Sequence, residues 1–262
     1  YDWSMSTLYF ATAAKSAVGL VRAGNEDSAL TSRSLVAVAD GMGGHAAGEV
    51  ASKIAISTLA ELSTIFTNPD IDSESADDIY LNSFHEIDQA LKSEVSENPQ
   101  LSGMGTTLTS LFLRDNSVAL LHIGDSRAYR LRGNTLEQLS VDHTVIQELL
   151  NQGAISESDI ATHPQRSVLT QVLMGEGNLE LPLPVFEGKI KDRYLLCSDG
   201  LSSVLSEKEI KSLIKGRDRD EAVNALIDAT YINGAPDNVT VVIADIVEEA
   251  QPDTTEKIGA AQ

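Results

Sequence analysis

The sequence is poor in cysteine, in basic residues and in long apolar runs, and each shortage excludes a class of protein. Cys197 is the one cysteine among 262 residues, so no disulfide forms within the chain and a cytoplasmic setting is the simplest expectation. Lys and Arg number 19 against 39 Asp and Glu, and the net charge of -20 disfavours nucleic acid and anionic membranes as partners. No apolar run approaches the ~18 residues of a membrane span, so we expect no direct membrane contact.

Length and composition favour one large domain. The chain is 42% hydrophobic and 22% charged, which is ordinary for a globular protein, and its length is near the upper limit for a single core. We place this domain at residues 6–247 and expect a monomer. Residues 248–262 are polar and show no periodicity, so we expect a polar tail or linker there.

Four aspartates stand where short apolar runs end. They lie in the runs VADGMGGH (38–45), IGDSR (123–127), CSDG (197–200) and PDNV (236–239). A carboxylate at the end of an apolar strand is costly to bury unless a cation or hydrogen-bond donors offset it. Four of them indicate a site for divalent metal, with two ions favoured over one. Oxygen ligands without clustered His or Cys suit Mg²⁺ or Mn²⁺ better than zinc.

The pattern of apolar residues predicts an α+β fold. Short runs rich in β-branched residues predict strands at 34–39, 107–113, 117–123, 127–131, 190–197 and 239–246. Turn residues at 115–116 and 133–134 separate pairs of these runs and favour antiparallel hairpins. Apolar residues at helical spacing predict helices across 50–62 and 80–95. Stacked antiparallel sheets with helices outside would bury all of these apolar faces.

Six short motifs, taken together, carry a resemblance to a known family. In chain order they are RAGNED (22–27), DGMGGH (40–45), GMGTT (103–107), IGDSR (123–127), SDGL (198–201) and DNVT (237–240). From about Thr7 to Val247 the sequence resembles the bacterial branch of the metal-dependent serine/threonine protein phosphatases of type 2C. The resemblance implies an α-β-β-α sandwich, with a flap subdomain at about residues 143–177.

The resemblance also implies an activity and a set of metal ligands. Family members hydrolyse phosphoserine and phosphothreonine in proteins with a hydroxide activated at a binuclear Mn²⁺ or Mg²⁺ centre. Asp40 would bridge the two ions, and the Gly41 carbonyl would bind one of them directly or through water. Asp199 and Asp237 would complete the ligands, while Asp27 would orient metal-bound waters from outside the first ligand shell. A third, weaker metal would lie at Asp125 and Ser167, together with Asp199.

Further residues match positions that handle the phosphate. Arg22 would clamp it, because a guanidinium offers a planar fork of donors to phosphate oxygens. Glu26 would support Arg22, and Asn238 would bond to bound water or phosphate. His45, five residues after Asp40, is predicted from spacing alone to protonate the leaving serine or threonine oxygen. The implied partners are phosphoproteins, including a eukaryote-like Ser/Thr kinase, and the tail is expected to lead to a membrane anchor.

Asp125, three histidines and the cysteine have a structural interpretation. Asp125 would pair with Arg127, and His122 would be a satisfied core histidine. His143 and His163 would be structural residues of the flap, and Cys197 a buried small hydrophobe.

Three other functions are not supported by the sequence, and one alternative stays open. The spacing of Gly41, Gly43 and Ala46 is that of a dinucleotide-binding turn, but Glu61 lies in a predicted helix rather than at the end of a second strand. A cysteine-dependent phosphatase would need arginine at position 203, which is Ser203. Calcium-binding loops of the EF-hand type are missing. A phosphatase fold that only binds its partner, with weak or no catalysis, remains the alternative.

Overall fold

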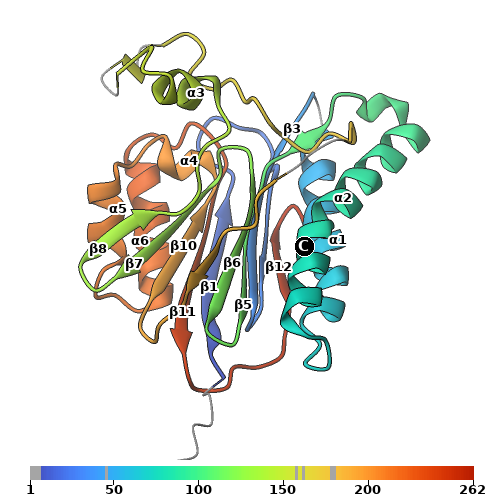
Figure 1. The fold of residues 1–262 in the computed structure, drawn as a ribbon. Coiled ribbons are helices and arrows are strands. Elements are labelled where there is room, and N and C mark those ends of the chain that lie inside the picture. The colour runs from blue at the N-terminus through green and yellow to red at the C-terminus, as the bar shows by residue number, and fades with distance from the viewer. Residues whose placement is uncertain (1–6, 45–46, 157–158, 161–162, 178–180) are drawn as a thin grey trace, which may run out of the picture.

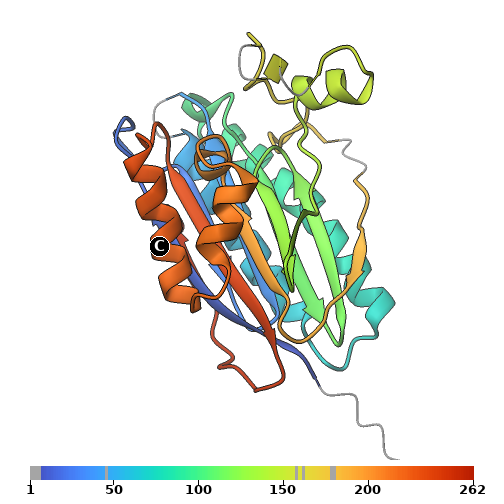
Figure 2. The same ribbon diagram turned by 90° about the vertical axis from the view of Figure 1, so that its left-hand side faces the viewer.

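Two antiparallel sheets stack face to face, and helices cover the outer face of each (Figures 1 and 2). The computed structural model describes residues 7–44, 47–156, 159–160, 163–177 and 181–262. This is the α-β-β-α sandwich expected from the sequence. Within these described residues no helix is both long and apolar enough to cross a bilayer.

In the described part of the chain, the first sheet has five strands. Their order is β1 (Tyr9–Ala17), β11 (Val239–Val247), β10 (Arg193–Cys197), β7 (Arg127–Arg132) and β8 (Thr135–Gln138). The helices on its outer face are α4 (Asp199–Ser202), α5 (Glu207–Ile214) and α6 (Arg219–Ile232). A complete capping box at Ser206 and Glu209 starts α5, which fixes where its apolar face meets the sheet.

The second sheet has seven strands among the residues that the structure describes. Six follow the order β12 (Glu256–Gly259), β2 (Asp27–Thr31), β3 (Leu35–Met42), β5 (Leu108–Arg114), β6 (Ser117–Ile123) and β9 (Val185–Glu187), and β4 (Gly105–Thr106) pairs with β3. The helices α1 (Ala47–Phe66) and α2 (Ser73–Glu97) cover its outer face, and a single turn, η1 (Pro99–Leu101), follows α2.

Strand β3 shows why the core has separate layers. Side chains alternate along a strand, so Leu35, Ala37 and Ala39 pack under the helices while Val36 and Val38 pack between the sheets. All five are fully buried. Burying a side chain of this size contributes on the order of 1.5–3 kcal/mol for Val or Leu. A strand buried on both faces is held firmly, and the last three residues of β3 are Asp40, Gly41 and Met42 of the DGMGGH motif.

The predicted strands and helices are confirmed with small shifts of their ends. Residues 190–197 are shorter than predicted, because Lys191 has a φ of 74° and lies in the turn before β10. Strand β1 escaped prediction because it is rich in alanine, a weak strand former, and its place is set by nine-residue pairing with β11.

The prediction of a polar tail is wrong for residues 256–262. Strand β12 pairs with β2, and Ala261 is buried against the α1–α2 layer. Ile258 and Ala261 are too few to give a periodic signal, and the edge of β2 supplies the pairing that orders the segment.

Candidate active site

The four motif aspartates meet at one end of the sandwich. Asp40 lies in β3, Asp125 follows β6, Asp199 begins α4 with one residue between it and β10, and Asp237 precedes β11. They line a single cavity of about 530 Å³. Other residues lining it are Arg22, Glu26, Gly41, Thr107, Ser167, Leu169, Val172 and Asn238. The tertiary structure therefore brings together motifs that are separated by more than 200 residues of chain.

Two glycines let the chain approach itself closely at this cavity. A Cβ on Gly41 would lie 2.0 Å from the carbonyl oxygen of Gly48, at the start of α1. A Cβ on Gly200 would lie 1.8 Å from the carbonyl oxygen of Asn238. Any side chain at either position would push two site-bearing segments apart, which explains why an aspartate is followed by glycine in both motifs.

Asp27 lies behind the cavity, directly opposite Asp40 in the β2–β3 ladder. Its side chain is buried, and Oδ2 accepts a 2.7 Å hydrogen bond from the Ser198 hydroxyl. Oδ1 is buried and has no hydrogen-bond partner among the described residues. A buried carboxylate oxygen without a donor is costly, so this atom fits a role in holding metal-bound water.

The electrostatics of the site call for cations. Burial, together with repulsion from neighbouring carboxylates, raises the pKa of Asp27 to about 7 and that of Asp125 to about 7. The pKa of Asp40 is raised well above its usual range for the same reasons, and burial followed by repulsion from Asp237 raises that of Asp199. These carboxylates ionise with difficulty when no cation is near, and they offer only oxygen donors. Such a site fits hard divalent ions such as Mn²⁺ or Mg²⁺. Within the described residues, no three Asp, Glu, His or Cys side chains lie close enough together to hold a metal ion.

Arg22 is the cation at the mouth of the cavity. Its side chain is 54% exposed, and Nη2 donates a 2.6 Å hydrogen bond to Asp237 Oδ2. This contact raises the pKa of Arg22 and turns one oxygen of Asp237 towards the guanidinium. Glu26 lines the same cavity, and its own pKa is raised by burial.

Asn238 fixes the loop that carries Arg22. Its Oδ1 accepts from the Glu26 amide, and its Nδ2 donates to the carbonyls of Val18 and Gly24, all at 2.8 Å. These contacts engage both ends of the side-chain amide. The sequence predicts that Asn238 contacts water or phosphate. Such a contact would come in addition to its structural role in this loop.

Arg127 does not pair with Asp125. Its Nε and Nη2 donate to Asp142 at 2.6–3.0 Å, and Nη1 donates to the Tyr129 hydroxyl. The interpretation of Asp125 as the partner of Arg127 is therefore wrong, and Asp125 faces the cavity instead. Asp142 was not predicted from the sequence, because its position directly before His143 gives no local signal.

The described part of residues 143–177, which the resemblance predicts to be a flap and which we call the flap, is attached to the sandwich beside two aspartates. The His143 amide donates to the Gly124 carbonyl, and Gly124 N–H donates to His143 Nδ1, next to Asp125. At the other end, Leu173 and Thr106 exchange two main-chain hydrogen bonds of 3.0 Å. The Thr106 hydroxyl in turn donates to the Asp40 carbonyl.

Within the flap, α3 (Val145–Asn151) is the described α-helix, and Ser167, Leu169 and Val172 face the cavity. Asp88 of α2, which the sequence analysis missed, anchors the end of the flap. It is buried and accepts the amides of Gly175 and Gly177 at 2.7 Å each.

Two further predictions for single residues, His122 and Cys197, are confirmed, and one cannot be compared with the structure. His122 bonds to Thr109 and to the Val141 carbonyl, so it is a satisfied core histidine, and burial keeps its pKa low, at about 3. Cys197 is fully buried, as expected. His45 lies outside the described residues.

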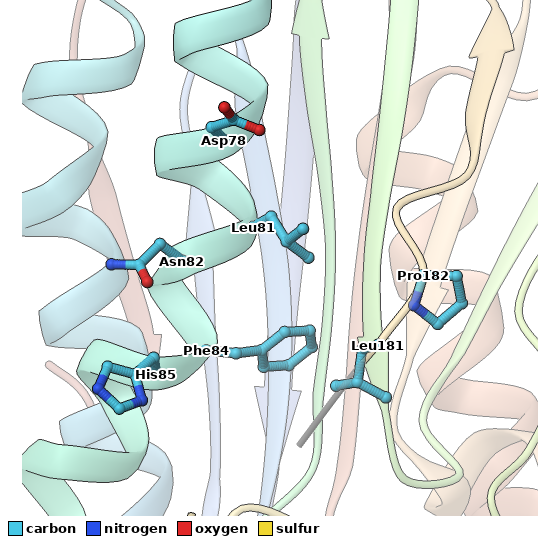
Figure 3. A pocket seen from close by; sticks show the side chains of 7 residues that line it. All are labelled: Asp78, Leu81, Asn82, Phe84, His85, Leu181 and Pro182. Atoms are coloured by element: carbon cyan, nitrogen blue, oxygen red, sulfur yellow. The ribbon is translucent and has the colours of Figure 1, made fainter. Parts of the chain in front are cut away.

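A second cavity lies between α2 and the segment that leads to β9 (Figure 3). Its lining includes Asp78, His85, Phe84 and Leu181. It has a volume of about 600 Å³, similar to that of the first. One carboxylate and one imidazole cannot replace four converging aspartates, so we assign the chemistry to the first cavity.

The fold and the acidic cavity define a class: sandwich proteins whose facing sheets hold carboxylates for divalent metal at one end. The family model for Protein phosphatase 2C matches residues 24–231. The chain belongs to this family, as the motifs indicated.

Known relatives agree with this assignment. The serine/threonine protein phosphatase PstP of Mycobacterium tuberculosis is 42% identical over 245 residues, which cover 92% of this chain and 46% of PstP. The chain thus spans about half the length of that relative. The serine/threonine phosphatase stp of Listeria monocytogenes is 33% identical over 233 residues, covering 87% of this chain and 92% of stp.

Solved structures agree as well. The crystal structure of PstP from M. tuberculosis has a TM-score of 0.83 at 42% identity and covers 90% of this chain and 98% of that one. The catalytic domain of PstP in complex with two manganese ions has a TM-score of 0.82 at 41% identity. That match covers 92% of this chain and 100% of the PstP chain.

Proposed function

We propose that this chain hydrolyses phosphoserine and phosphothreonine in proteins, with Mn²⁺ or Mg²⁺ as cofactor. The observation that carries the proposal is the convergence of four aspartates and one arginine on a single cavity. The two manganese ions in the PstP catalytic domain, at 41% identity, support a binuclear centre here. Because the substrates of such an enzyme are products of protein kinases, we include a Ser/Thr kinase among its partners.

The proposed metal ligands follow from the donors that line the cavity. Asp40, Asp199, Asp237 and the carbonyl of Gly41 would hold two ions, and Asp125 with Ser167 would hold a third. When bound, such ions lower the pKa of coordinated water and neutralise phosphoryl oxygens. Asp27 would keep water oriented through its unpartnered Oδ1, while Ser198 holds its other oxygen.

Arg22 is proposed to bind the phosphate of the substrate. Its half-exposed guanidinium already bonds to one carboxylate oxygen of Asp237, and its remaining donors suit two phosphate oxygens. Water attacks phosphorus, the bond to the serine or threonine oxygen breaks, and that oxygen takes a proton, giving a hydroxyl group and inorganic phosphate. His45 stays a prediction for the group that supplies this proton.

One experiment separates this enzyme from a phosphatase fold that only binds. Hydrolysis of p-nitrophenyl phosphate and of a phosphothreonine peptide is measured with Mn²⁺, and then with chelator in place of the metal. The proposal expects turnover of both substrates that needs Mn²⁺. Binding of the phosphopeptide without release of phosphate at any Mn²⁺ concentration would favour the binding module instead.

A further inference from the structure

Residues 256–262 lie beside the strand that begins at Asp27. Strand β12 pairs antiparallel with β2, from Glu256 opposite Thr31 to Gly259 opposite Ser28. The next amide, that of Ala260, donates a 2.8 Å hydrogen bond to the carbonyl of Asp27. Strand β2 is therefore an internal strand, with β3 on its other side, and Figure 1 shows β12 in red beside α1.

Side chains hold this segment, which we call the clasp (residues 256–261), on both faces of the sheet. Ala261 is 5% exposed and packs in the layer under α1 and α2. Ile258 packs against the layer between the sheets. The ammonium of Lys257 donates a 3.1 Å hydrogen bond to the Ser57 hydroxyl of α1. The clasp is thus docked as firmly as an ordinary edge strand with a buried face.

Gly259 fits against the hydrogen-bonded groups around Asp27. It has a φ of +73°, and a Cβ there would lie 2.3 Å from the Asp27 carbonyl oxygen and 3.0 Å from Ser16 Oγ. Ser16 bonds to the Thr240 hydroxyl at 2.6 Å and accepts from Asn25 at 2.8 Å. Asn25 Oδ1 in turn accepts from the Asp27 amide. Any side chain at 259 would therefore press on both the main chain of Asp27 and the residues that hold it.

The strand register carries this contact to the metal site. Gly259 lies opposite Ser28, and the neighbouring Asp27 lies opposite Asp40, the proposed bridging ligand. The side chain of Asp27 can point its unpartnered oxygen correctly only if its backbone stays in this register. The family model ends at residue 231, so the clasp lies outside the part of the chain that it matches.

We propose that the clasp positions Asp27 and thereby sets the affinity of the site for divalent metal. The proposal rests on the proposed function, because it takes Asp27 to hold metal-bound water. It assigns a positioning role to Gly259 and to the main-chain amide of Ala260. Neither touches substrate, so they should influence metal binding and leave recognition of the phosphoprotein unchanged.

The test compares two glycine variants of the full chain. Gly259→Ala introduces the clash with Asp27, whereas Gly133→Ala, at the β7–β8 turn, also has a positive φ (+60°) but meets no atom within 4 Å. Both pay the backbone cost of a left-handed alanine, and only the first disturbs Asp27. Mn²⁺ affinity is measured by calorimetry, and the Mn²⁺ concentration for half-maximal activity is measured alongside.

We expect Gly259→Ala to weaken Mn²⁺ binding roughly 10- to 100-fold, the range found when groups that orient metal ligands are changed. The KM for phosphopeptide at saturating Mn²⁺ should stay as in the unchanged chain, and Gly133→Ala should leave both values unchanged. A folded Gly259→Ala protein that binds Mn²⁺ as tightly as the control would overturn the proposal.

A milder variant covers the case in which Gly259→Ala does not fold. Lys257→Ala removes the bond to Ser57 and should speed hydrogen exchange of the β2 amides while weakening Mn²⁺ binding in the same direction. Faster exchange with unchanged Mn²⁺ affinity would refute the positioning role. Calorimetry also distinguishes the two proposals, since an unchanged chain that binds Mn²⁺ without hydrolysing phosphate contradicts only the proposed function.

Discussion

The strand ends that carry the aspartates and the flap that lies beside them are built in opposite ways. Ala39, directly before Asp40, and Cys197, two residues before Asp199, are fully buried in two different layers of the core. In the flap, α3 buries Ile146 and otherwise presents half-buried or exposed side chains. Buried strands hold metal ligands in place, whereas a lightly packed segment can adapt to different phosphoproteins. We therefore expect catalysis to depend on the first region and substrate choice on the second.

The largest effect should come from the strand ends. Asp199→Asn keeps the shape of the side chain and removes its charge, so we expect turnover to fall ~100-fold or more on every substrate. Initial rates at saturating Mn²⁺ check this. Asp245→Asn, near the far end of β11 in an ion pair with Arg193, is the control and should retain its rate. Near-normal kinetics for Asp199→Asn would remove this residue from the metal site.

Arg22→Ala should act at the boundary of the two regions. Hydrogen bonds to charged groups are worth about 1.5–3 kcal/mol, so losing the phosphate clamp should raise the KM for phosphopeptide by roughly tenfold or more. Arg33→Ala is a matched control, because Arg33 is also an exposed arginine paired with an aspartate, Asp253. The KM for phosphopeptide is measured by steady-state kinetics for both variants. Equal KM values for Arg22→Ala and Arg33→Ala would argue that Arg22 does not bind phosphate.

The flap should distinguish large substrates from small ones. Asp125 lies next to Gly124, which bonds to His143 at the base of the flap. We expect Asp125→Asn to lower turnover of a phosphoprotein by ~10-fold and that of p-nitrophenyl phosphate by less, because only the larger substrate reaches the flap. Parallel assays of the two substrates measure the ratio. An equal loss on both substrates would show that Asp125 acts through the metal site alone and not through the flap.

The smallest effect concerns stability and pH in metal-free protein. Folding raises the pKa of Asp27 and of Asp125 to about 7, from a value near 4 in the unfolded chain. Below pH 4 both states are protonated and these groups cost nothing. As pH rises from 4 to 7, the unfolded state ionises first and the folded state loses stability.

Thermal unfolding with chelator should therefore show Tm falling over this window, by ~2–4 °C for each kcal/mol lost. Added Mn²⁺ should reverse the decline, since it binds the ionised carboxylates. A metal-free Tm that rises between pH 4 and 7 would show that other groups dominate the pH dependence.

The two regions also differ in how well the sequence predicted them. The strands that carry or lead to Asp40, Asp125 and Asp199 were predicted from their apolar, β-branched runs, so their aspartates were identified as candidate ligands. For residues 143–177, the resemblance supplied the limits of the flap and a metal-binding role for Ser167, and no helix or strand was predicted there. The anchor at Asp88 was invisible, because it depends on Gly175 and Gly177 folding back onto α2.

By itself the sequence determined the chemistry: carboxylates at the ends of apolar strands, with glycines beside them, need a cation or hydrogen-bond donors wherever they are buried. The tertiary structure alone decided which groups meet. It paired Arg127 with Asp142 rather than Asp125, and it joined Asp27 to Asp40 across a ladder. It also ordered residues 256–259 on the edge of β2. Short motifs indicate which residue types are needed at a site. Contacts between distant residues depend instead on strand register and on burial that exists only in the folded chain.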